Sequence, residues 1–220
     1  AVELDAEQAH FHLNLAQALI FGGDNSGALA SLLSALTADS SLSLPLDLLS
    51  RIQLAMEDQA DAERLYAAAL RKIYSDIRER EAELNLDALP PEQAVKQLTE
   101  TTFDFFENNT AFLSITRSEN LLGGRFISQM PEIQKMSAPF LDKISDALKR
   151  GHAEGVFRAG IDVLQLYVSI VALSAHHINA SHTLSATFGR DISSVAWRQE
   201  RRAHVVEMIQ NAVALRESTA

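Results

Sequence analysis

The sequence predicts an all-α protein. Apolar residues recur every three or four positions along nearly the whole chain, as they do on one face of a helix. Nine glycines and five prolines among 220 residues favour long helices over strands and turns. No segment shows a convincing strand pattern, so helices are expected throughout.

The N-terminal helices are separated by residues that break or start helices. Gly22-Gly23 ends the first run, a Ser-rich stretch follows the second, and Pro45 occupies a first-turn position in the third. The fourth run is long and carries mixed charges along its outer face. The expected helices are 6–21, 28–36, 45–56 and 60–84.

The C-terminal helices are delimited in the same way. Pro90-Pro91 opens one helix, Asn108-Asn109 breaks it, Gly123-Gly124 forms a loop, and Gly151 ends a later helix. The run 161–178 is strongly apolar, which predicts a buried or interfacial helix. The expected helices are 91–107, 110–121, 130–150, 161–178 and 195–215.

Charge is distributed unevenly along the chain. Of residues 1–63 only Arg51 is basic and ten are acidic, so this segment carries −9 of the formal net charge of −10. Affinity for DNA comes largely from Lys and Arg that neutralise phosphates. DNA binding by residues 1–59 is therefore not expected.

Residues 10–40 and 44–74 share a pattern at an offset of 34 residues. Ala28, Leu32 and Ala35 correspond to Ala62, Tyr66 and Ala69. The segment NLAQALIFGGDNSGALASLLSALTADS resembles a tetratricopeptide unit, although Ser40 stands where that family favours Pro. This resemblance predicts an acidic helical hairpin over 1–59 that could dock a protein partner. The alternative is a pair of ordinary amphipathic helices.

From Leu65 onward the chain resembles the ligand-binding and dimerisation region of the tetracycline-repressor (TetR) family. The resemblance rests on ERLYAAALRKIYSDIRERE, LDALPPEQAVKQLTETTFDFFENNTAFLSI, ENLLGGRFI, RGHAEGVFRAGID and TLSATFGRD, followed by RRAHVVEMI. It implies an effector-binding and dimerisation domain over 60–220. The residues before Leu65 do not match the DNA-reading head of that family. Only Leu65-Tyr66 agree with the last residues of the head.

Five phenylalanines fall within 24 residues, and the resemblance implies that this region walls an effector pocket. Aromatic side chains around an apolar cavity suit a small hydrophobic effector. Core packing is the alternative. Asn120 and Arg125 flank the Gly123-Gly124 loop and either orient a polar ligand group or serve in capping and ion pairing. The candidate ligand contacts here are Phe103, Phe106, Phe112, Asn120 and Phe126.

His176, His177 and His182 cluster near the end of the apolar run. Adjacent His176 and His177 point to different helix faces and cannot easily share one metal ion, which needs ligands on one face. No metal and no cofactor are expected. His177 is instead a candidate to face the effector pocket or a dimer partner.

The run 161–178 is apolar on more than one face, so a second surface is expected to be covered. The TetR resemblance implies a two-fold homodimer in which this helix and the last one form a four-helix interface. Enclosure within the chain's own domain is the alternative. The candidate interface residues are Leu166, Tyr167, Ile170, Val205, Val206 and Ile209.

The sequence favours regulation over catalysis. It has no Gly-rich phosphate loop, no nucleophile elbow and no cysteine, so no enzyme activity is expected. No stretch of 18 apolar residues occurs, and we expect a cytoplasmic protein without membrane association. The first functional hypothesis is a TetR-like regulator that senses a small hydrophobic ligand. The alternative is a protein-interaction module that uses the tetratricopeptide-like segment.

Overall fold

The computed structural model describes residues 11–16, 19–20, 24–38 and 59–215. These residues are overwhelmingly helical, and the one β-type contact among them is an isolated antiparallel bridge between Phe157 and Ala214. The all-α prediction is therefore confirmed.

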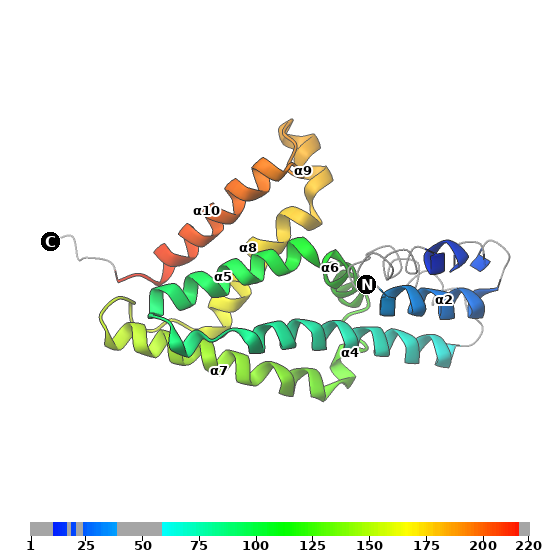
Figure 1. Ribbon diagram of the computed structural model, residues 1–220, viewed down its shortest axis with the longest axis horizontal. Coiled ribbons are helices and arrows are strands. Elements are labelled where there is room, and N and C mark those ends of the chain that lie inside the picture. Colours follow the sequence, from blue (N-terminus) through cyan, green and yellow to red (C-terminus); the bar gives the residue numbers. More distant parts are fainter. Residues whose placement is uncertain (1–10, 17–18, 21–23, 39–58, 216–220) are drawn as a thin grey trace. The chain divides into compact units, whose positions relative to one another are not determined.

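Eight helices and two 3-10 turns are described over their full length (Figure 1). They are α2 (Asn25–Ala38), α4 (Gln59–Glu83), η1 (Leu86–Ala88), α5 (Pro91–Asn108), α6 (Thr110–Leu121), η2 (Ile127–Gln129), α7 (Pro131–Ala153), α8 (Val163–Asn179), α9 (Ser181–Phe188) and α10 (Val195–Val213). The expected helix 45–56 lies outside the described residues. Of the run 6–21, residues 11–16 and 19–20 are helical.

Local chemistry explains several helix ends. Pro91 and Pro131 each occupy the first position of a helix, where the missing N–H has no cost. The Asp162 side chain caps α8 by accepting a hydrogen bond from the Gln165 N–H at 2.8 Å. Gly189 follows α9 at φ 62°, a left-handed conformation that glycine adopts without strain.

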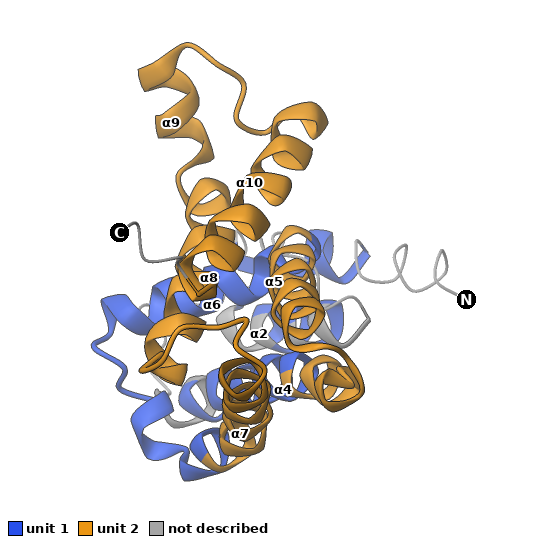
Figure 2. Cartoon of the chain, turned by 90° about the vertical axis from the view of Figure 1, so that its left-hand side faces the viewer, with its two compact units in different colours: residues 1–77, 108–134 blue, residues 78–107, 135–220 orange. Residues whose placement is uncertain are grey.

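The chain divides into two compact units (Figure 2). Unit 1 contains residues 1–77 and 108–134, and unit 2 contains residues 78–107 and 135–220. Neither limit coincides with the expected boundary between 1–59 and 60–220. The long helix α4 contributes residues to both units, and an unbroken helical period does not show where a helix changes its packing partners.

Unit 1 buries small residues together with larger ones. Ala16, Ala28 and Ala35 are fully buried, as are Leu32 and Tyr66. Small side chains let helices approach closely, as the tetratricopeptide pattern requires. Much of the second repeat lies outside the described residues, so the repeat stays a prediction.

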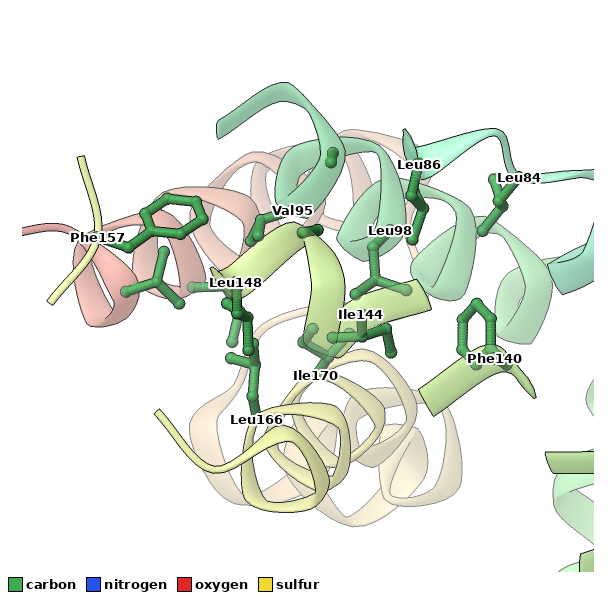
Figure 3. Close-up of a cluster of buried hydrophobic side chains, with 14 of the residues drawn as sticks. Leu84, Leu86, Val95, Leu98, Phe140, Ile144, Leu148, Phe157, Leu166 and Ile170 are labelled. Carbon is green, nitrogen blue, oxygen red and sulfur yellow. The ribbon is translucent and has the colours of Figure 1, made fainter. Parts of the chain in front are cut away.

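Unit 2 is built on a hydrophobic core from α5, α7, α8 and α10 (Figure 3). Leu98, Ile144 and Ile170 lie near its centre and are at most 1% exposed. Phe157, in the segment between α7 and α8, packs on Gly151, where a Cβ atom would overlap its ring. Full burial of each such side chain contributes about 1.5–3 kcal/mol. This core holds the helices that carry the candidate site.

Among the described helices, none is by itself long and apolar enough to cross a membrane. Helices α8 and α9 reach the necessary length and composition as a pair, but they are bent by 70° at their junction.

Candidate ligand-binding site

A buried polar cluster centres on His177 in α8. The imidazole is 3% exposed, and its Nε2 lies 2.7 Å from Oε1 of Glu107 in α5. The other oxygen of that carboxylate accepts a hydrogen bond from Nη1 of Arg198 in α10 at 2.6 Å. One carboxylate thus links three helices of unit 2.

Two aromatic rings flank the imidazole. Phe103 stacks on His177 with ring centroids 5.1 Å apart and planes 13° apart. Trp197, the chain's single tryptophan, lies 5.6 Å from His177 at a tilted angle. Phe103 and Glu107 are four residues apart and so share one face of α5. The imidazole is therefore fixed both by packing and by a charge-assisted hydrogen bond.

Burial lowers the pKa of His177, the hydrogen bond and charge of Glu107 act in the opposite direction, and Arg201 and Arg198 lower it further. The neutral imidazole is therefore favoured. With a carboxylate facing Nε2, that nitrogen carries the proton and donates it. Nδ1 then presents a lone pair, and it is buried without a hydrogen-bond partner among the described residues.

An open groove of about 230 Å³ lies beside this cluster between α5 and α10. A second set of ion pairs crosses it. Arg202 binds both oxygens of Asp104, each at 2.7 Å, and contacts Glu100 at 2.9 Å. The groove is lined by Phe103, Asp104, Glu107, Val195, Arg198, Gln199 and Arg202.

The second imidazole nitrogen of His177 meets no nucleophile among the described residues. A carboxylate-oriented imidazole can act as a base when a nucleophile reaches its other nitrogen. Ser174 lies one turn before His177 on α8, but it is fully buried, and no hydrogen bond joins the two side chains. Within the described part of the chain, no group of three or more His, Asp or Glu residues could hold a metal ion.

Three of the predicted ligand residues lie in unit 2. Phe103 and His177 are in direct contact, whereas Phe106 is 1% exposed and packs edge-on against Phe105. Sequence analysis did not identify Glu107 or Arg198. The spacing of four residues between Phe103 and Glu107 was an available signal. The pairing of Glu107 with Arg198 joins residues 91 positions apart, which periodicity does not reveal.

The other three lie in unit 1. Phe126 packs against Tyr66 and Phe112 against Tyr74, with centroids 4.8 and 5.3 Å apart. Asn120 is exposed, and its Nδ2 donates to the Thr116 carbonyl of its own helix at 2.8 Å. A pocket that these residues share with Phe103 and His177 stays a prediction.

The loop after α6 is held by residues next to Asn120. Glu119 is buried, and its Oε1 accepts hydrogen bonds from the Phe126 and Ile127 N–H groups at 2.6 and 3.0 Å. Arg125 forms an ion pair with Glu63 at 2.6 Å. Burial raises the pKa of Tyr66, and the nearby Glu119 carboxylate raises it further. Arg125 is thus engaged in an ion pair, one of the two roles considered from the sequence.

The predicted interface residues lie on the inward faces of α8 and α10. Leu166, Ile170, Val205, Val206 and Ile209 are buried within the single chain, and Tyr167 donates its hydroxyl to Glu81 at 2.7 Å. A helix that is apolar all round shows its hydrophobic faces but not which face meets its own core. The large apolar residues exposed on these two helices are Leu164, Val168, Val195 and Met208.

The region that carries this cluster matches a known sequence family. The family described as tetracyclin repressor-like, C-terminal domain, matches residues 91–209, which is more than half of the chain. The HTH-type transcriptional repressor NicS of Pseudomonas putida is 28% identical over 131 residues.

The aligned residues are 60% of this chain and 62% of NicS, so the chain spans about three fifths of that relative. No solved structure matches the chain. Helices α5 to α9 and most of α10, with the His177 cluster and the groove, lie within the matched region. Through this region the chain belongs to the tetracycline-repressor-like family.

Proposed function

We propose that this chain is the ligand-sensing and dimerising body of a TetR-like transcriptional regulator. The observation that carries the proposal is the position of the His177 cluster and its groove inside the family match. A buried polar group beside aromatic rings and an open groove is the usual composition of a small-molecule site. NicS, named as a transcriptional repressor, is in agreement with this role.

The ion pairs across the groove supply a mechanism. Arg198 binds Glu107, and Arg202 binds Asp104, so both pairs join α10 to α5. A ligand in the groove competes for these groups and thereby changes the relative stability of two arrangements of the helices. Such a ligand acts by shifting a population that exists before it binds.

Dimerisation is assigned to the outward faces of α8 and α10. Leu164 and Val168 on α8 are each more than half exposed, and Met208 on α10 is also exposed. Apolar residues gathered on an exposed surface often mark an interface. We therefore assign the homodimer contact to these residues, with Leu166, Ile170, Val205, Val206 and Ile209 supporting them from the core.

A protein-interaction module remains the second candidate, because residues 1–63 carry ten acidic side chains and one arginine. That balance suits a basic or helical protein partner better than DNA. In both candidates unit 2 keeps its role as sensor and dimer body.

The test is a small-molecule screen that uses Trp197 as the reporter. Its emission comes from within the proposed site, because it is the chain's single tryptophan and lies beside His177. A ligand is expected to change the emission saturably and to raise the melting temperature by mass action. Trp197→Phe serves as the control, since it must lose the optical signal and keep binding by calorimetry. The sensing role is contradicted if a broad panel of one- and two-ring compounds leaves the melting temperature unchanged.

A further inference from the structure

The two arginines of the groove differ in how completely they are used. Arg202 commits all three nitrogens, with Nε and Nη2 on Asp104 and Nη1 on Glu100. Within the described residues Arg198 makes a single ion pair, from Nη1 to Glu107. Its Nε is buried and has no hydrogen-bond partner among those residues. A guanidinium presents five N–H donors, so Arg198 retains unused donors at the groove.

The acceptors beside it are already engaged. Glu107 accepts hydrogen bonds on both oxygens, one from His177 and one from Arg198. Both oxygens of Asp104 are bound by Arg202. Each oxygen of these two carboxylates thus already accepts a hydrogen bond from a cation or from His177, whereas Arg198 keeps N–H groups without a partner among the described residues. A ligand that supplies acceptors complements those N–H groups.

The local charge tolerates an anion. Among the groove-lining residues, the carboxylates of Asp104 and Glu107 are each paired with a guanidinium group, from Arg202 and Arg198 respectively, so these four charges balance. His177 adds no charge, because burial lowers its pKa. Helix α10 also begins at Val195, and the N-terminal end of a helix carries a partial positive charge.

The size and lining of the groove limit the ligand further. A volume of about 230 Å³ lies below the usual range for drug-sized ligands, which is roughly 300–1,000 Å³. A single ring or a short chain fits this space. The exposed side chain of Val195 provides most of the apolar contact surface, and Phe103, which lines the groove but is 2% exposed, contributes only a small part of it.

Resting on the proposed function, we infer that the groove between α5 and α10 binds a small, flat carboxylic acid. Arg198 recognises the carboxylate, and Phe103 with Val195 contacts the apolar part. Arg is suited to this task because its planar fork matches the two oxygens of a carboxylate. The sequence predicted a hydrophobic effector, and this inference revises the ligand class to an amphipathic acid.

The test compares three single-ring probes of nearly equal shape, namely benzoate, benzamide and benzylamine. Binding is measured by calorimetry and by Trp197 emission on the full chain. Benzoate is expected to bind, with benzamide and benzylamine at least about tenfold weaker, since hydrogen bonds to charged groups are the stronger ones. Arg198→Gln is expected to weaken benzoate binding by roughly tenfold to a hundredfold.

Two control variants separate recognition from folding. Arg190→Gln removes an exposed arginine whose contact with Glu200 is 3.4 Å long, and it must leave benzoate binding unchanged. Arg198→Lys keeps the positive charge for Glu107 but loses the fork, so it is expected to fold normally and bind benzoate with reduced affinity. Thermal unfolding of each variant verifies that it folds.

Several results overturn the inference. Equal binding of the three probes, or full benzoate affinity in folded Arg198→Gln, excludes carboxylate recognition by Arg198. A preference for benzamide or benzylamine excludes a carboxylic acid as the ligand. It still shows that the groove binds small molecules, so the proposed function is not contradicted. If no probe binds, the acid is also rejected, and the broad panel described above decides the sensing role independently.

Discussion

At the scale of single residues, His177 makes stability depend on pH. Its pKa is lowered in the folded chain, chiefly by burial, while the unfolded chain has the ordinary value of about 6.5. Near and below that value the unfolded state binds more protons than the folded state. Stability contributed by the neutral imidazole is therefore complete above about pH 6.5 and is lost as the pH falls through the folded pKa.

We expect His177→Gln to flatten this loss of stability on mild acidification. The free energy of unfolding, measured by urea denaturation from neutral pH to about pH 5, should fall more steeply in the wild type than in the variant. His176→Gln is the control for replacing a histidine at this end of α8, since the adjacent imidazole is exposed and lies outside the buried cluster. Parallel curves for the wild type and His177→Gln would show that His177 does not titrate in this range.

The residues of the site show how far sequence reasoning extends. Phe103 and His177 were identified separately, from aromatic density and from a histidine cluster, and the structure places their rings in contact. Glu107 and Trp197 were not identified. Glu107 was passed over because an acidic residue on an amphipathic helix ordinarily faces solvent. Tertiary packing brings Glu107 next to His177, although the two residues are 70 positions apart, and makes it a hydrogen-bond partner of the buried imidazole.

At the scale of elements, Arg150 in α7 is hydrogen-bonded to the segment that precedes α5. Its Nη1 donates to the Leu89 carbonyl and its Nη2 to the Leu86 carbonyl, each at 2.8 Å. We expect Arg150→Met to lower the free energy of unfolding by about 1–3 kcal/mol, because these carbonyls lose their charged donor. Chemical denaturation measures the change.

Lys149→Met provides the matched control for that change. Lys149 is the preceding residue, and its pair with Asp146 is exposed, so a much smaller change than that of Arg150→Met is expected. Equal effects of the two substitutions would mean that the Arg150 hydrogen bonds contribute nothing particular to the fold.

Helices were predictable from the sequence wherever a helix-breaking residue bounded a run of apolar residues with helical spacing. The sequence placed the start of α5 at Pro91 and the break between α5 and α6 at Asn108-Asn109, and the structure agrees. Helix α9 was not anticipated as a separate helix. None of its residues is buried, so no inward apolar stripe was present to reveal it.

At the scale of the whole molecule, the proposed dimer would use a helix face that periodicity alone could not select. Val168 on α8 is 53% exposed, whereas Ile170, two positions later, is fully buried. We expect Val168→Glu to weaken self-association at least tenfold, because it introduces a charge into an apolar contact. Sedimentation equilibrium measures the dissociation constant.

Leu121→Glu controls for a general effect of replacing an exposed apolar residue by an acid. Leu121 is 84% exposed at the end of α6, which belongs to unit 1, and it is not among the residues assigned to the interface. This variant should dimerise like the wild type. If Val168→Glu also retains the dimer, the contact lies on another surface than the outward face of α8.

The charge distribution of the chain makes a prediction about nucleic acid. With Arg51 as the single basic residue among ten acidic ones, residues 1–63 repel a polyanion instead of releasing its counterions. We expect no binding of a labelled DNA duplex by this chain in fluorescence anisotropy, even at low salt, with polylysine as the positive control. Protein that binds with an affinity falling steeply as salt rises would reveal phosphate contacts, and the acidic segment would then have to be reassigned as part of a DNA-binding surface.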